Sequence, residues 1–315
     1  GTVELYGSND VNIGLSNGSY FHNVRVDKSS KQKEVDAAKN KYIIKQDRDG
    51  KILKFERTNI VTASNNSVIN NNLYIDNGTF NLGGNKVNVA DSIAIYDKLQ
   101  MVSASDTLHG NRIIWFNGSS DNVTNGEIQF YSSWNFKDGT NANLGTGNTV
   151  RVVGENYGTS WFLNTDSDAA FGNLAIDRNP GGSGYTYLAN YDTLRINGTM
   201  KIKAGNEFQT GAFEMIVNDT LDIEATALLE MNVDTANLIN NSNFVLNGHL
   251  DVDEANVLIN GQFELASTGK LSIDGGNFIS NAPYSKDKAI QYLRGTLKLT
   301  DGLFEIQNNH IYLSN

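Results

Sequence analysis

The sequence predicts an all-β protein, a right-handed parallel β-helix of about 12 turns. Three observations lead to this fold: short phrases of alternating apolar residues, Asn-Gly or Asp-Gly pairs between them, and an unusual composition. The chain has 44 Asn and 30 Gly but only 2 Pro among its 315 residues. Scarce proline fits a sheet in which nearly every strand donates its N–H groups to a neighbour.

The recurring phrases account for most of the predicted strands. Alternation with a period of two predicts strands with one buried face. The clearest copies lie at residues 73–82, 194–202, 244–252, 257–265, 271–279 and 299–306.

The spacing of the glycines suggests the size of one turn. Gly248, Gly261 and Gly275 are 13 and 14 residues apart, and Gly302 follows after 27. If each glycine marks a corner, two arms of about 13 residues make a turn of about 26. Asn-Gly between strands is also the strongest hairpin signal, so an antiparallel β meander or sandwich is the alternative fold.

Repeat phrases continue along the whole chain, which predicts one domain over residues 1–315. An eight-residue phrase recurs at 21–28 and 171–178, with a weaker copy at 131–138. Two stretches interrupt the pattern, and we expect them to be surface insertions near 28–50 and 179–186. The first is rich in Lys, with a segment at 29–40 that reads as a loop or a short helix.

Charge and hydropathy exclude several classes of protein. A net charge of −10 would repel a phosphate backbone, so we expect no nucleic-acid partner. No apolar run is long enough for a membrane span, and no signal segment opens the chain, so we expect a mature exported fragment. The absence of Cys removes disulfides and thiolate chemistry.

No catalytic residue is predicted from the sequence, because the four His are dispersed and no nucleophile motif occurs. If the protein were instead a β-helix polysaccharide lyase or hydrolase, its active face would lie near Trp161. The residues of that alternative face are Arg151, Asp166, Asp168, Asp177 and Arg178. No cofactor is expected, although Ca²⁺ is conceivable: Asp47 and Asp49 form a fragment of a calcium loop, but the segment lacks the further ligands and a plain turn is the favoured interpretation.

Aromatic residues in the middle third offer a second kind of site. Trp161, Tyr157 and Tyr185 are candidates for stacking against carbohydrate if their rings are exposed. Trp115 and Trp134 lie within alternating apolar phrases, which favours a place in the core.

A short pattern of Asp, then Ser or Thr, then an apolar residue occurs five times. The hydroxyl residues are Ser92, Thr107, Thr193, Thr220 and Thr235. One interpretation is that Asp simply turns a corner before a strand. The triplet also resembles the O-glycosylation acceptor motif of Bacteroidetes, and the resemblance implies glycans at these five positions. Phrases such as FGNLAI and LRINGT, within a span from Val3 to Ile306, are similar to the Asn/Gly-rich β-helical regions of surface proteins exported by the type IX route in that group.

Together these observations predict an extracellular structural or adhesive cell-surface protein. Its partners would be itself, through end-to-end or lateral contacts in a fibre or sheath, or surface glycans. The alternatives are the polysaccharide lyase or hydrolase and a non-catalytic carbohydrate-binding module.

Overall fold

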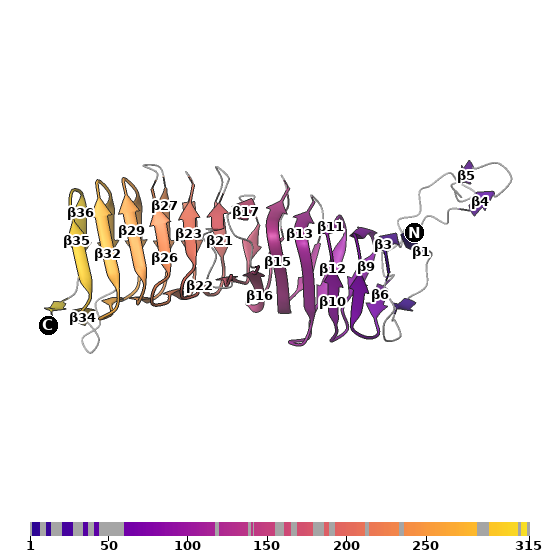
Figure 1. Ribbon diagram of the computed structural model, residues 1–315, viewed down its shortest axis with the longest axis horizontal. Coiled ribbons are helices and arrows are strands. Elements are labelled where there is room, and N and C mark those ends of the chain that lie inside the picture. The colour runs from indigo at the N-terminus through magenta and orange to yellow at the C-terminus, as the bar shows by residue number, and fades with distance from the viewer. Residues whose placement is uncertain are drawn as a thin grey trace, which may run out of the picture.

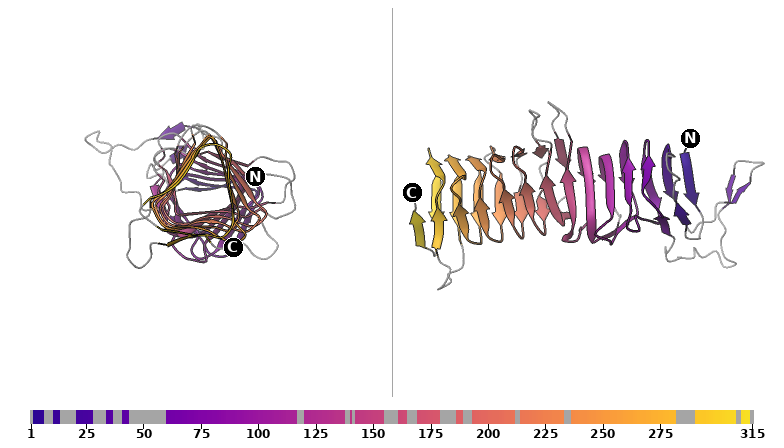
Figure 2. Two further views of the ribbon diagram at one scale, coloured as in Figure 1. Left: turned by 90° about the vertical axis from the view of Figure 1, so that its left-hand side faces the viewer. Right: turned by 60° about the horizontal axis from the view of Figure 1, so that its bottom comes forward.

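The computed structural model describes most of the chain. The described residues are 2–6, 11–13, 21–27, 34–36, 41–43, 60–116, 120–137, 140, 142–154, 161–164, 169–178, 186–188, 193–211, 214–232, 236–281, 290–307 and 310–313. They form a rod of stacked turns, with three sides visible end-on (Figures 1 and 2). The strands of the rod pair in parallel, so the predicted parallel β-helix is confirmed and the antiparallel meander is wrong.

Each side of the rod is a column of strands from successive turns. The first side comprises β2 (Val11–Ile13), β6 (Ile60–Ala63), β9 (Thr79–Asn81), β12 (Lys98–Met101) and β14 (Ser120–Val123), then β18 (Ala170–Phe171), β21 (Leu194–Ile196), β24 (Glu214–Val217), β27 (Asn237–Asn240), β30 (Asn256–Ile259), β33 (Asn277–Ser280) and β36 (Leu303–Ile306). These strands make one five-stranded and one seven-stranded sheet.

The second and third sides are joined into a single 23-stranded sheet by β13 (Thr107–Trp115) and β15 (Asn125–Phe136), which continue from one side onto the other. The second side also holds β7 (Ser67–Ile69), β10 (Lys86–Val89), β16 (Gly147–Val152), β19 (Asn173–Ile176), β22 (Met200–Ile202), β25 (Leu221–Ile223), β28 (Phe244–Leu246), β31 (Phe263–Leu265), β34 (Ile290–Leu293) and β37 (His310–Leu313). The third side adds β1 (Thr2–Tyr6), β3 (Asn23–Asp27), β8 (Leu73–Asn77), β11 (Ser92–Ile95), β17 (Trp161–Asn164), β20 (Thr186–Leu188), β23 (Glu207–Thr210), β26 (Leu228–Met231), β29 (His249–Asp253), β32 (Lys270–Asp274) and β35 (Thr296–Leu299).

The turns are shorter than predicted and have three sides instead of two arms. Leu229, Leu250 and Leu271 are successive partners in the register, at intervals of 21 residues. The glycines at 248, 261 and 275 therefore lie at three different corners, and each interval between them covers two of the three sides. Shorter turns alone would give more than twelve, but long segments such as the one between β3 and β8 take up residues, and the number of turns differs slightly from the expected twelve.

Gly302 shows why glycine is required at one corner. It follows β35, and it occupies the same corner as Gly276 one turn earlier. Its φ of 99° lies in the left-handed region, and an added Cβ would collide with the carbonyl oxygen of Gly276. The Asp-Gly pair therefore turns a corner between sheets, in contrast to the hairpin expected from such a pair.

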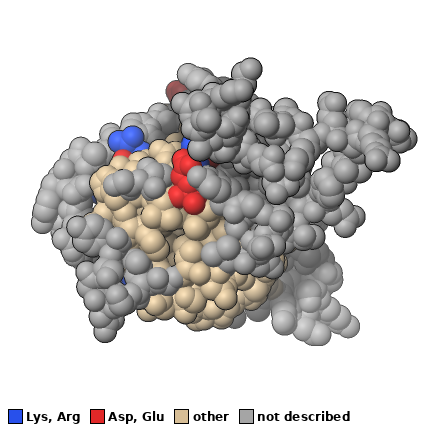
Figure 3. Space-filling model, turned by 90° about the vertical axis from the view of Figure 1, so that its right-hand side faces the viewer, with Lys and Arg blue, Asp and Glu red and all other residues tan. Residues whose placement is uncertain are grey.

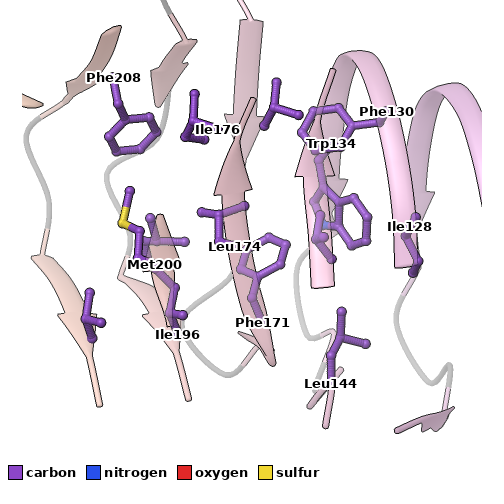
Figure 4. Packing of buried hydrophobic residues seen from close by; sticks show 14 of the residues in the cluster. Ile128, Phe130, Trp134, Leu144, Phe171, Leu174, Ile176, Ile196, Met200 and Phe208 are labelled. Atoms are coloured by element: carbon purple, nitrogen blue, oxygen red, sulfur yellow. The ribbon is translucent and has the colours of Figure 1, made fainter. Parts of the chain in front are cut away.

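The core is a set of stacks of inward side chains (Figure 4). Trp115 and Trp134 are fully buried, as predicted, with ring centroids 5.8 Å apart. The ring centroid of Trp134 is also 5.3 Å from that of Phe171, which lies further along the rod. Because most strands with described burial alternate buried residues with half-buried or exposed ones, the apolar interior continues along the described turns.

Asparagine side chains form ladders at the edges of the first side. Asn241 Nδ2 donates to Asn218 Oδ1 at 2.9 Å, and Asn260 Nδ2 donates to Asn241 Oδ1 at the same distance. Other Asn oxygens accept from main-chain N–H groups of the neighbouring turn, as Asn243 Oδ1 does from Gln262 N at 2.9 Å. These bonds give the surplus of Asn a structural role.

The two expected insertions fall mostly outside the described residues. Val24 and Leu73 are partners 49 residues apart in the sequence, so the segment between β3 and β6 is additional to an ordinary turn. Within it, β4 (Glu34–Asp36) and β5 (Lys41–Ile43) form an antiparallel pair. Residues 179–185 of the second insertion are not described, and the prediction of one domain remains a prediction.

Truncation of a core stack should destabilise the rod strongly. Phe263 is 1% exposed and contacts the rings of Phe244 and Phe278 at 5.6 and 4.7 Å. We expect Phe263→Ala to lower the free energy of unfolding by roughly 3–5 kcal/mol because of lost burial and the cavity left behind. Val245→Ala, on the outward side of β28, is the control and should cost less than about 0.5 kcal/mol. Urea denaturation followed by circular dichroism measures both, and equal effects would contradict this packing.

Candidate functional surfaces

Among the described residues of the alternative enzyme face, Arg151 and Asp177 come together, but as an ion pair. Arg151 points outward from β16 and is held between two carboxylates, with Nη2 2.8 Å from Glu127 Oε2 and Nη1 2.5 Å from Asp177 Oδ2. Hydrogen bonding to Glu127 raises the pKa of Arg151. Burial alone would raise the pKa of Glu127, but the bonds from Arg151 and Gln129 outweigh it and lower that pKa. The trio is therefore an ion-pair ladder across three turns, in which one Arg bridges two carboxylates.

The remaining members of that face lie elsewhere or outside the described residues. Arg178 is 6% exposed, and burial lowers the pKa of its guanidinium. Its main-chain N donates to Asn206 Oδ1 at 2.8 Å, which ties it to a corner of the next turn. Asp166 and Asp168 are not among the described residues. Arg178 is thus placed for structural contacts, away from any substrate on the surface.

A second ion-pair ladder lies further along the same side. Lys201 Nζ is 2.6 Å from Asp222 Oδ2 and 2.8 Å from Glu224 Oε1, and Lys203 Nζ is 3.4 Å from the same Glu224 oxygen. Hydrogen bonding from Lys201 lowers the pKa of Glu224 to about 2. The parallel register places these residues on adjacent turns, so opposite charges stack along the rod.

The predicted aromatic candidates are not brought together among the described residues. Trp161 begins β17, but its side chain is not described, and Tyr157 and Tyr185 lie outside the described residues. A different pair is exposed at the end of the third side: the rings of Tyr96 and Phe116 stack at 3.9 Å with an angle of 11°. Tyr96 is 42% exposed.

The sequence contains a signal for the pair of Tyr96 and Phe116. Tyr96 and Phe116 each follow immediately after an alternating apolar phrase, at the position where the strand reaches a corner. Nearby, Arg25 lies 5.5 Å above the centre of the Tyr74 ring and pairs with Asp76 at 2.8 Å. Viewed from the N-terminal end, charged side chains are few on the described surface (Figure 3).

The described glycosylation candidates lie at corners or at the first residue after one. Ser92 and Thr107 begin β11 and β13, and Thr193 and Thr220 directly precede β21 and β25. Thr220 is exposed, and its Oγ1 is 3.4 Å from Asp219 Oδ1. Thr235 lies outside the described residues.

At least one Asp of these triplets has a structural task. Asp106, before Thr107, is fully buried. Its carboxylate accepts from Gly84 N at 2.6 Å and from Ser103 N at 2.9 Å, bonds that hold a corner together. The corner interpretation therefore applies to Asp106, whether or not Thr107 is modified.

The seven-stranded sheet of the first side has an unexpected outer surface. Between the two asparagine ladders runs a column of four half-buried aliphatic side chains on consecutive turns. The members of this aliphatic column are Ile216, Ile239, Leu258 and Ile279. Strand phrases such as NLIN and NVLI contain the signal, because an apolar residue occupies the outward position where most strands of the other sides have a polar one.

The described residues offer neither a metal site nor a membrane-spanning helix. They contain no group of three or more His, Asp or Glu that could hold a metal ion, and Asp47 and Asp49 lie outside them. No described helix is long and apolar enough to cross a membrane.

Removal of Lys201 should release the acidic partner it holds. We expect Lys201→Met to move the pKa of Glu224 from about 2 back towards the ordinary value of 4.5, because its principal hydrogen-bond donor is lost. The lowered pKa stabilises the native protein fully above pH about 4.5, and this contribution is lost as the pH falls towards 2. NMR titration of the Glu224 side chain measures the shift, with Lys86→Met as a control that should leave Glu224 unchanged. An unaltered titration in Lys201→Met would contradict the ion-pair assignment.

Comparison with known proteins adds no further identity to these surfaces. No family model matches the chain, no curated protein is significantly similar to it, and no solved structure matches its fold significantly. The functional assignment therefore depends on the rod and on the side chains that its register brings together.

Proposed function

We propose that this protein is an extracellular structural or adhesive module of a cell surface, glycosylated at the corners of its rod. The observation that carries the proposal is the repetitive outer surface. Over the described turns, Arg151 and Lys201 stand in ion-pair ladders with carboxylates, and asparagines bond to asparagines of the next turn. Such a surface suits a spacer or an extended contact better than a single reaction.

The glycosylation part of the proposal is supported by position. Corner residues project away from the sheet faces, so a glycan there would leave the faces free for contacts. Four of the five candidates are described: Thr193 and Thr220 lie at corners, and Ser92 and Thr107 are the first residues of strands, next to corners. Bulky hydrophilic groups at the corners would also suit a protein exposed to the medium.

The polysaccharide lyase or hydrolase has less support than the structural module. A catalytic Arg or Asp must reach the substrate, whereas Arg151 is engaged by two carboxylates and Arg178 is buried. A carbohydrate-binding role has one specific observation in its favour, the exposed stack of Tyr96 on Phe116 beside the Arg25–Asp76 pair. Flat rings next to charged hydrogen-bonding groups are suited to the faces and hydroxyls of sugars.

Glycan occupancy can be tested on protein purified from the cells that produce it. We expect an intact mass above that of the polypeptide, and Thr220→Val should lose one glycan because this exposed hydroxyl follows an Asp. Thr300→Val is the matched control, since Thr300 is exposed but follows Leu299. A native mass equal to that of the polypeptide would contradict glycosylation while leaving the structural role open.

Carbohydrate binding can be tested on a glycan array with unmodified recombinant protein. We expect Tyr96→Ala to lower the affinity at least about tenfold for any glycan that the unaltered chain binds, because the open ring face is removed. Tyr131→Ala is the control, because Tyr131 is 36% exposed but lies on the second side against His109. Equal loss in both variants would place the glycan away from the Tyr96 stack.

A further inference from the structure

The aliphatic column consists of four apolar side chains in succession, whereas Val68 and Val245, outward aliphatic residues of the second side, have polar partners in the register. The register stacks Ile216 on Ile239, Ile239 on Leu258, and Leu258 on Ile279, each one turn apart. All four are outward positions of strands whose alternate residues fill the core. Core packing therefore does not require them to be apolar, and polar side chains would serve equally well if this face met only water.

The borders of the column make this face flat and regular. On one border, Asn256 Nδ2 donates to Asn237 Oδ1 at 3.3 Å and Asn277 Nδ2 donates to Asn256 Oδ1 at 2.7 Å. On the other border runs the ladder through Asn241 and Asn260. Amides that bond to one another along the rod are held in fixed rotamers, so little side-chain entropy would be lost on contact with a partner.

Charge on this face is confined almost entirely to its ends. The outward positions of β24, β27, β30 and β33 include a single charged residue, Glu214. The register places Arg195 directly before Ile216 and Glu305 directly after Ile279. For a chain of net charge −10, a face with so few charges lets two copies approach with little repulsion.

We propose that this face packs against the same face of a second copy, with the two rods antiparallel. A second copy has the same spacing of about 4.8 Å between turns, so its aliphatic column meets this one in register along its whole length. A two-fold axis parallel to the strands brings Arg195 of each copy opposite Glu305 of the other. The alternative two-fold axis, along the rod, would oppose Arg195 to Arg195 and Glu305 to Glu305. The inference rests on the proposed structural role and names its lateral contact.

The size of the face sets the strength of this contact. Five steps of about 4.8 Å give a length of about 24 Å. Four to five strand residues give a width of about 15 Å. The two copies would bury on the order of 700 Å² in total, below the roughly 1,200–2,000 Å² of stable interfaces. A single contact is therefore weak, and many rods on one surface would reinforce it by multivalency.

Sedimentation of the purified chain over micromolar to millimolar concentrations tests the contact. We expect a reversible dimer that Ile239→Lys and Leu258→Lys each weaken by at least about tenfold, because each places a charge in the centre of the face. Val245→Lys is the matched control, since Val245 is an outward aliphatic residue on the second side and 39% exposed. Circular dichroism and thermal melts establish that each variant keeps its fold.

Cross-linking distinguishes the two orientations, and the absence of native Cys makes it specific. A copy with Arg195→Cys, mixed with a copy with Glu305→Cys, should be joined by a bismaleimide that spans the ~10 Å between packed sheets. Arg195→Cys alone should give little product. Abundant product from Arg195→Cys alone would overturn the antiparallel arrangement.

Three other outcomes would also overturn the inference. One is a chain that remains monomeric throughout, without cross-links, and another is a dimer that Ile239→Lys leaves intact. The third is a chain that stays monomeric but binds glycan, and that loses this binding in Ile239→Lys. This result would identify a polysaccharide as the occupant of the face. The first two outcomes do not affect the glycan mass measured for Thr220→Val or the glycan binding measured for Tyr96→Ala. Failure of the lateral contact is therefore distinguishable from failure of the proposed function.

Discussion

The parallel hydrogen-bond ladder between successive turns is the constraint on which the rest of this protein depends. Each turn lies about 4.8 Å above the last, so a side chain meets its equivalent in the next turn at contact distance. Phe244 therefore stacks on Phe263 in the core, and Asn218 bonds to Asn241 at the surface. Any residue that interrupts the ladder would affect three neighbouring turns at once, which gives a physical reason for the scarcity of proline.

The same spacing decides which charges the surface tolerates. On the second side, opposite charges alternate between turns, so Arg151 and Lys201 each satisfy two carboxylates. On the third side, Glu230 stands on a turn between Glu207 and Asp251, and its pKa is raised by burial first and then by the charge of Glu207. The Gln209 amide donates to Glu230 and to Glu207, which reduces the cost of placing like charges on adjacent turns.

A structure built in this way distributes its properties along a line. Its three sides differ in chemistry: an ion-pair side, a side with exposed rings and acids, and an amide-bordered aliphatic side. Extended and repetitive surfaces of this kind favour many weak contacts with a partner that repeats at a similar spacing. A structural or adhesive role uses this arrangement directly, whereas catalysis would need a local departure from the repeat.

Alternation of apolar residues and the surplus of Asn and Gly determined by themselves that the chain is an all-β rod of parallel strands, with Trp115 and Trp134 inside. The tertiary structure alone decided the number of sides, because strands with the same alternation occur on all three sides. The similar phrases at 21–28 and 171–178 illustrate this: β3 belongs to the third side and β19 to the second. Ion pairs such as Arg151 with Glu127 join residues 24 positions apart, and the aliphatic column joins residues from four turns. Such groupings depend on the length of each turn, which corner residues and insertions set and no local pattern encodes.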